Sequence, residues 1–196
     1  MARGYSATWQ RIARRIRVPV GFAFTVLYLW LARPTWKSIL LGAVFVIAGI
    51  VVRALASGHL KKNEQLATTG PYAHTRNPLY LGSLILALGF ALAALNWWIA
   101  IGLALIFAAI YLPVIQAEET FLRTKFPEFA EYAGKVPRIF PRVTHFQHPD
   151  GGFSWGLYRK HREYNAALGS VALMAALVMK LLWSILHTAS ARNSIF

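Results

Sequence analysis

The chain has 196 residues, of which 57% are hydrophobic and only 14% charged, and it carries a net charge of +14. A soluble domain is usually about a quarter charged, so this composition predicts a membrane protein with basic loops. Nucleic acid is disfavoured as a partner, because the cations flank apolar runs instead of covering one polar face. Cysteine is absent, which excludes disulfides, thiolate nucleophiles and cysteine-based metal sites.

Residues 1–17 form a basic amphipathic N-terminal segment. Within "WQRIARRIR" (residues 9–17), apolar residues recur at helical spacing and arginines fill the other face. This pattern is typical of a helix that lies in the headgroup region against anionic lipid. A basic cluster that only sets topology is the alternative. No A-x-A-like site follows, so no cleavable signal peptide is predicted.

Apolar runs of transmembrane or nearly transmembrane length predict an all-α, polytopic membrane bundle of about five helices. The third and fourth runs are separated by Asn96 alone and must form a tight antiparallel helical hairpin. Gly82, Gly89 and Ala93 would let helices approach closely. Pro113 predicts a kink in the fourth run, with a lateral slot as the functional alternative. The runs are 18–32, 38–56, 79–95, 97–115 and 166–187.

The distribution of Lys and Arg predicts the orientation of the bundle. The N-terminal segment and the polar segments 57–78 and 116–165 hold most of the cations, which places all three on the cytoplasmic side and the C-terminus outside. Two cations lie within apolar runs. Arg53 and Lys180 are predicted to snorkel to the interface, with an inward-facing Lys180 as the alternative.

The stretch "TTGPYAHTRNPLYLG" (residues 68–82) is more elaborate than a connector between two helices requires. Further along the chain, Glu118 and Glu119 follow the fourth run directly, and Arg138 lies between two prolines in "KVPRIFP". These carboxylates can be held charged by Arg76 and Arg138 if the two segments meet. An ion-pair cluster that only fixes loop packing is the alternative.

In combination, "GPYAHTRNPLYLG", the hairpin, the Glu-Glu pair and "Y-x3-VPR-x2-P" resemble the isoprenylcysteine carboxyl methyltransferase and phospholipid N-methyltransferase superfamily of integral-membrane enzymes. The resemblance spans residues 70–141, within a transmembrane core of residues 18–142 that a loop and a last helix follow (143–196). It implies a cytoplasmic pocket for S-adenosylmethionine (SAM) and a lipophilic, membrane-embedded methyl acceptor. It assigns catalytic roles to Arg76, Glu118 and Glu119, and cofactor binding to Gly70, Pro71, Tyr72, Arg76, Asn77, Pro78, Tyr80, Glu119, Tyr132, Arg138 and Pro141.

These residue types suit SAM. Arginines can hold its carboxylate, glutamates its ammonium or ribose hydroxyls, and tyrosines its adenine. Three departures from the family pattern stand out: Asn77 replaces a histidine, Phe129 and Pro127 replace a tyrosine and a glycine, and no arginine shortly precedes the Glu-Glu pair. The last departure weakens a prenylcysteine-carboxylate substrate. An ammonium-type acceptor would need a base, for which His74, Glu118 or Glu119 are candidates.

Two other classes remain open at this stage. An NADPH-dependent membrane reductase of the sterol reductase type shares the C-terminal cofactor region, and a non-catalytic scaffold or lipid binder could retain the architecture. No metal site is predicted, because the histidines match no compact ligand motif apart from the pair His145 and His148.

Overall fold

The computed structural model describes residues 6–143, 146 and 152–193, and within them all regular secondary structure is helical. The all-α prediction is therefore confirmed. In chain order the elements are α1 (Ala7–Leu31), α2 (Trp36–His59), the 3₁₀ helix η1 (Gly70–Ala73), α3 (Pro78–Ala94), α4 (Trp97–Ile106), the π-helix η2 (Phe107–Tyr111), α5 (Leu112–Lys125), α6 (Phe129–Lys135), α7 (Trp155–Lys160) and α8 (Tyr164–Asn193).

Five apolar helical stretches correspond to the five predicted spans. Three are long and apolar enough to cross a bilayer, namely Trp36–His59, Trp97–Lys125 and Tyr164–Thr188, and two shorter ones are Val18–Leu31 and Pro78–Ala94. Large apolar side chains point outward along these helices, with Leu40 and Trp183 each 68% exposed. Such a surface is stable only in lipid, so the chain is an integral membrane protein.

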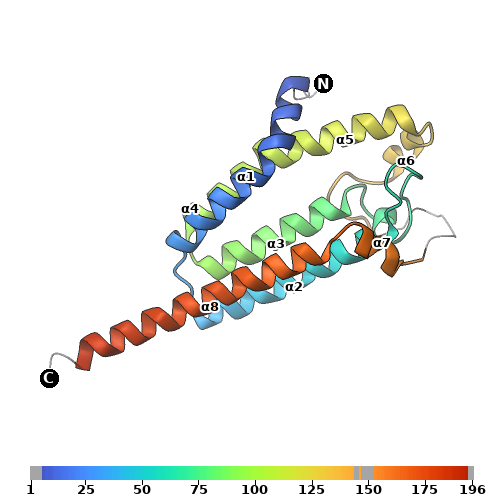
Figure 1. Cartoon of the computed structure of the whole chain (residues 1–196). Coiled ribbons are helices and arrows are strands. Elements are labelled where there is room, and N and C mark those ends of the chain that lie inside the picture. The colour runs from blue at the N-terminus through green and yellow to red at the C-terminus, as the bar shows by residue number, and fades with distance from the viewer. Residues whose placement is uncertain (1–5, 144–145, 147–151, 194–196) are drawn as a thin grey trace.

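The helices form two layers, one of α1 with α4, η2 and α5 and the other of α2, α3 and α8 (Figure 1). Within the second layer, α2 and α3 approach through paired glycines. A Cβ on Gly89 would lie 2.7 Å from the Gly42 carbonyl oxygen, and one on Gly49 would lie 2.8 Å from the Gly82 carbonyl oxygen. Ala93 is fully buried. The predicted close approach through Gly82, Gly89 and Ala93 is confirmed.

The hairpin between α3 and α4 is confirmed as a two-residue turn. Leu95 adopts a left-handed conformation with φ of 48°, and the Asn96 side chain accepts a hydrogen bond from the Trp98 backbone N–H at 2.9 Å. From this turn the helices diverge (Figure 1). The hairpin is therefore tight at the turn and open toward the other end.

A π-helical segment, η2, stands just before Pro113, where the sequence predicts a kink. Proline has no N–H to donate to the carbonyl four residues earlier, that of Ala109. The Trp9 indole N–H donates to this carbonyl instead, at 2.9 Å. Because a bare carbonyl is costly inside a bilayer, this bond also fastens the start of α1 to η2.

The carboxyl end of α1 is closed in a similar way. The Arg33 N–H donates to the Ala94 carbonyl and residue 34 is proline, so the Leu29 and Trp30 carbonyls lack their usual helical donors. Lys180 Nζ donates to both, at 2.9 Å from the Trp30 oxygen. The ammonium of Lys180 therefore caps the end of a neighbouring helix, and its reach to the membrane interface stays a prediction.

The Arg53 side chain, for which snorkelling stays a prediction, likewise has partners within the protein. Its guanidinium pairs with Glu163, at 2.8 Å from Nη2 to Oε2, and donates from Nη1 to the Ser83 hydroxyl at 2.6 Å. Both charged side chains are largely buried, at 21% and 14% exposure. A carboxylate from the start of α8 thus holds the cation of α2 within the bundle.

Candidate functional site

The site lies at the end of the bundle where η1, α6 and α7 gather, which we call the polar end (Figure 1). Here the proline elbow (residues 68–82) and the VPR segment (residues 136–142) bond to each other through their backbones. The Arg76 N–H donates to the Pro137 carbonyl at 2.9 Å, and the Arg142 N–H donates to the His74 carbonyl at 3.1 Å. The His74 ring nitrogen Nδ1 lies 3.0 Å from the Arg142 carbonyl oxygen. Two stretches some sixty residues apart in sequence therefore fold onto each other.

The sequence of the elbow accounts for its shape. Gly70 has φ of +57°, a conformation that favours glycine. Pro71 and Pro78 stand in the first turns of η1 and α3, where a missing N–H costs nothing. These residues fix the backbone direction and offer no polar side chain, and the same is true of Pro141 in the VPR segment.

The carboxylate of Glu119 is the centre of the site. Its Oε2 accepts hydrogen bonds from Arg138 Nη2 at 2.7 Å and Nε at 3.0 Å. Its Oε1 accepts one from Asn77 Nδ2 at 3.1 Å and lies 3.3 Å from Arg76 Nε. The Glu119 side chain is only 10% exposed. The structure thus brings together four of the predicted site residues, two from the elbow and one each from α5 and the VPR segment.

Asn77 explains one departure from the family pattern. Its amide nitrogen donates to Glu119 Oε1 and also, at 3.0 Å, to the Arg138 carbonyl oxygen. An amide nitrogen carries two hydrogens, whereas each imidazole nitrogen carries at most one. Asparagine therefore serves two acceptors from one atom, and the buried Thr75 hydroxyl donates to the same Arg138 carbonyl at 3.2 Å.

Arg76 is the more buried of the two arginines. Its side chain is 13% exposed, against 49% for Arg138. Burial lowers the pKa of the Arg76 guanidinium, the charge of Glu119 opposes that shift and Arg138 adds to it. Because arginine stays protonated in proteins, Arg76 is a buried cation whose counter-ion is Glu119. Its Nη1 also donates to the Ala133 carbonyl at 3.1 Å.

The predicted bend at Pro127 is a break. Phe126 before the proline is extended and ends α5, after which α6 begins at Phe129. Phe129 and Tyr132 are buried in a small apolar cluster with Val136. The start of the VPR segment packs in this cluster through Val136. Phe129 therefore has a packing role at the position where the family has tyrosine.

Tyr72 and Tyr132 form part of the framework of the site. Tyr132 is buried, and its hydroxyl donates to the Tyr72 carbonyl at 2.7 Å. Burial raises the pKa of both phenols well above the usual value. The Tyr132 hydroxyl is bonded within the protein, in contrast to the expectation for a tyrosine that presents its ring to adenine and keeps its hydroxyl in water. Both tyrosines instead tie the elbow to α6.

Glu118 lies at the exposed edge of the site. It is solvent-accessible, and its Oε1 accepts a hydrogen bond from the Tyr80 hydroxyl at 3.0 Å. The Tyr80 ring meets the Tyr111 ring edge-on, with 6.0 Å between centroids. Through Tyr80 and Tyr111 the polar end is connected to the interior of the bundle.

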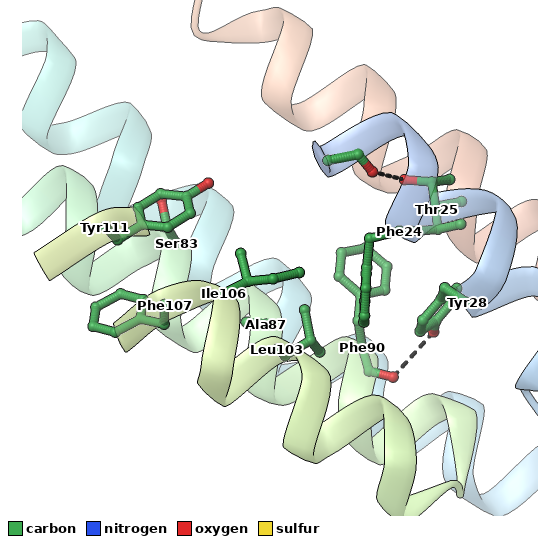
Figure 2. A pocket seen from close by; sticks show the side chains of 12 residues that line it. Phe24, Thr25, Tyr28, Ser83, Ala87, Phe90, Leu103, Ile106, Phe107 and Tyr111 are labelled. Carbon is green, nitrogen blue, oxygen red and sulfur yellow. Dashed lines mark hydrogen bonds between the residues drawn. The ribbon is translucent and has the colours of Figure 1, made fainter. Parts of the chain in front are cut away.

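A cavity of about 210 Å³ lies in that interior between the two helix layers. We call Glu119 with Arg76, Asn77 and Arg138 the Glu119 network. Ser83 and Tyr111 line the end of the cavity nearest this network, and Tyr28 and Phe90 line the opposite end (Figure 2). The remaining walls are mainly apolar. The full lining is Gly21, Phe24, Thr25, Tyr28, Ser83, Ala87, Phe90, Leu103, Ile106, Phe107, Tyr111 and Leu173.

Sequence reasoning missed several residues of this arrangement. Thr75 and Arg142 bond across the two segments, and the position of Thr75 inside the elbow was the only signal for it. The cavity residues carried no signal, because a single apolar run does not show which of its faces turns inward. Among the described residues no group of three or more His, Asp or Glu could hold a metal ion. His145 and His148 lie outside the described residues.

Comparison with known proteins agrees with this geometry. The family model described as phospholipid methyltransferase matches residues 20–128, more than half of the chain. The chain therefore belongs to the phospholipid methyltransferase family of membrane proteins, which confirms the resemblance drawn from the motifs. No solved structure matches the chain significantly.

Three curated relatives are similar over much of the chain. A cobalt-zinc-cadmium resistance protein, CzcN, of Cupriavidus metallidurans is 35% identical over 77% of this chain and 72% of its own length. A nickel-cobalt-cadmium resistance protein, NccN, of Alcaligenes xylosoxydans is 35% identical over 60% of this chain and 55% of its own. A probable protein-S-isoprenylcysteine O-methyltransferase of rice is 34% identical over 55% of this chain and 63% of its own. The first two names describe a resistance, and only the third describes a reaction.

The unequal environments of the two adjacent glutamates give a test of the site. Replacing Glu119 by Gln leaves buried Arg76 without its counter-ion, which should lower the free energy of unfolding by about 3 kcal/mol. The matched change Glu118→Gln removes one exposed hydrogen bond and should cost less than about 1 kcal/mol. Thermal melting of both variants in detergent measures the difference. Equal melting temperatures would contradict the assignment of Glu119 as the buried anion.

Proposed function

We propose that the protein transfers a methyl group from SAM to a lipophilic acceptor held within the bilayer. The observation that carries this proposal is the Glu119 network, which joins both family motifs at one end of the bundle. The adjacent Glu118 is linked to the apolar cavity through Tyr80 and Tyr111. A site of this kind gives water-borne and membrane-borne reactants access to one place from opposite directions.

The groups left over in the network fit the amino-acid end of SAM. Arg138 directs Nε and Nη2 at Glu119 and is half-exposed. Its Nη1 makes no hydrogen bond within the described part of the chain, so it can receive a carboxylate. Glu118 uses Oε1 for Tyr80, and its exposed Oε2 can receive an ammonium. A cationic group on Arg138 and an anionic group on Glu118, the residue next to Glu119, suit a zwitterion.

Once bound, SAM supplies a sulfonium methyl that is already electrophilic, so the protein mainly has to align the reactants and exclude water. The Glu119 network fixes the elbow against the VPR segment and hence the depth of the site. The cavity walls exclude water from the path of the acceptor. Alignment in a dry site needs rigid surroundings, and a carboxylate that accepts three hydrogen bonds and pairs with two arginines provides them.

The structure narrows the candidates for a general base. Glu119 is held by two arginines and an amide, and each of these contacts favours the charged form over a protonated one. His74 Nδ1 donates to the Arg142 carbonyl, and in a neutral imidazole the other ring nitrogen is then the one that accepts a proton. Since the second oxygen of Glu118 is assigned to the ammonium of SAM, His74 and Glu118 both stay candidates for the base that an ammonium-type acceptor needs.

The orientation of the site belongs to the same proposal. The excess of Lys and Arg in the polar segments supports a cytoplasmic position for the polar end, where SAM is available. Since the chain has no cysteine, single cysteines at exposed Lys61 and exposed Arg33 can be labelled specifically. In intact cells a membrane-impermeant maleimide should label position 33 and leave position 61 unlabelled. The reverse pattern would contradict the cytoplasmic assignment.

Isothermal titration of S-adenosylhomocysteine into the detergent-purified protein tests the methyl-donor site. The wild type should bind, and Glu118→Gln should bind about tenfold more weakly because a charge-assisted hydrogen bond worth about 1.5 kcal/mol is lost. Glu128→Gln, an exposed change between α5 and α6, should bind like the wild type. A folded wild-type protein that shows no binding would remove the methyltransferase proposal.

A further inference from the structure

The last helix, α8, contributes to the cavity although it lies outside residues 20–128, the region that the family model matches. Leu173 is the residue of α8 that lines the cavity. The other lining residues come from α1, α3, α4 and η2. Through Leu173, α8 supplies part of the wall of the cavity.

Two polar contacts fix where α8 stands. Near its start, Glu163 accepts hydrogen bonds from Arg53 at 2.8 and 3.1 Å to one oxygen and at 3.0 Å to the other. Further along, Lys180 caps the carboxyl end of α1. These contacts lie about 15 Å before and 10 Å after Leu173, at 1.5 Å per residue. A helix held on both sides of a residue presents that residue at a fixed depth.

The first of these contacts reaches the cavity itself. The Arg53 guanidinium that binds Glu163 also donates to the Ser83 hydroxyl, and Ser83 lines the cavity end nearest Glu118. Arg53 therefore fixes both the start of α8 and the end of the cavity at Ser83.

Leu173 belongs to the opposite end of the cavity, the end lined by Tyr28 and Phe90. It packs against the buried cluster that includes Tyr28 and Leu177, together with Phe90 and Leu103. Ser83 and Phe90 are two turns of α3 apart, about 10 Å. The cavity of 210 Å³ holds about seven groups of the size of water or methylene at roughly 30 Å³ each. Length and volume together describe room for one short apolar chain that ends against Leu173.

We propose that Leu173 determines how long an apolar chain the acceptor site accepts, with α8 serving as the end wall of that site. This inference rests on the proposed function, since it takes the cavity as the place of the acceptor. It adds a specificity-determining residue in a helix outside the matched region.

The test measures chain length directly, without the methyl donor. A single cysteine replaces Thr25, which lines the cavity, and the protein is placed in lipid nanodiscs. Its modification by N-ethylmaleimide is followed in the presence of n-alkanols of increasing length, and the longest alkanol that protects the cysteine is recorded. A cysteine at Val26, which is 72% exposed on the lipid side, controls for partition of the alkanols into the bilayer.

Leu173→Ala should lengthen the longest protecting alkanol by about three carbons, the size of the space left by the truncated side chain. Leu173→Phe should shorten it. Val171→Ala, an exposed position on the same helix, should leave it unchanged. A general loss of packing would reduce protection in both Leu173 variants, so opposite shifts identify the end wall. If either variant fails to fold, Leu173→Val decides with a smaller shift in the longer direction.

An unchanged limit in the folded Leu173 variants overturns this inference, even where S-adenosylhomocysteine binds. A shifted limit in a protein that does not bind S-adenosylhomocysteine overturns the proposed function and leaves the chain-length role of Leu173 standing.

Discussion

The polar end of this protein depends on one buried carboxylate. Glu119 is paired with two arginines and an asparagine, and these partners come from two segments that lie some sixty residues apart in the chain. Charges removed from water are stable only when their partners are complete. The elbow, α5 and the VPR segment therefore have to assemble together, and the same contacts that satisfy Glu119 create the floor of the candidate site.

The bilayer imposes a second constraint, since each backbone group inside it needs a partner. At two irregular places in the chain, side chains from distant helices provide the missing hydrogen-bond donors. The Trp9 indole donates to the Ala109 carbonyl, and Lys180 donates to carbonyls at the end of α1. The Tyr28 hydroxyl adds a bond to the Phe90 carbonyl at 3.0 Å. As a result α1 is fastened at its two ends to different layers, and its middle turns border the cavity between them.

Much of this architecture follows from the sequence. Hydropathy predicts the helical spans, a single asparagine predicts the hairpin, and the order of the motifs predicts that Arg76, Glu119 and Arg138 share one end of the bundle. Each of these predictions rests on local pattern or on chain order. The roles of Arg53 and Lys180 could not be predicted in this way, because their partners Glu163 and α1 are more than a hundred residues away. Hydropathy shows only that a cation in an apolar run is unfavourable in free energy. The partner that compensates for this is visible only once the helices are packed together.

The tyrosines show the same limit within the motifs. The family resemblance places Tyr72 and Tyr132 in the cofactor site, and the structure buries both and joins hydroxyl to carbonyl between them. A motif records which residues occur together, and it does not separate those that touch a ligand from those that hold the ligand-binding segments in register. Asn77 is the instructive case: its exchange for histidine looks like a lost proton carrier in sequence, and in the structure it is a double donor that joins Glu119 to the VPR segment.

The most direct test of this account is a disulfide between the two segments, which the absence of native cysteine makes unambiguous. The Arg142 N–H donates to the His74 carbonyl, so cysteines at positions 74 and 142 lie within range of a disulfide. In native membranes under mild oxidation, mass spectrometry of tryptic peptides should show this pair linked and the control pair at positions 33 and 142 unlinked. A 74–142 pair that stays reduced in folded protein would show that the two segments do not meet, and the site built on Glu119 would be wrong.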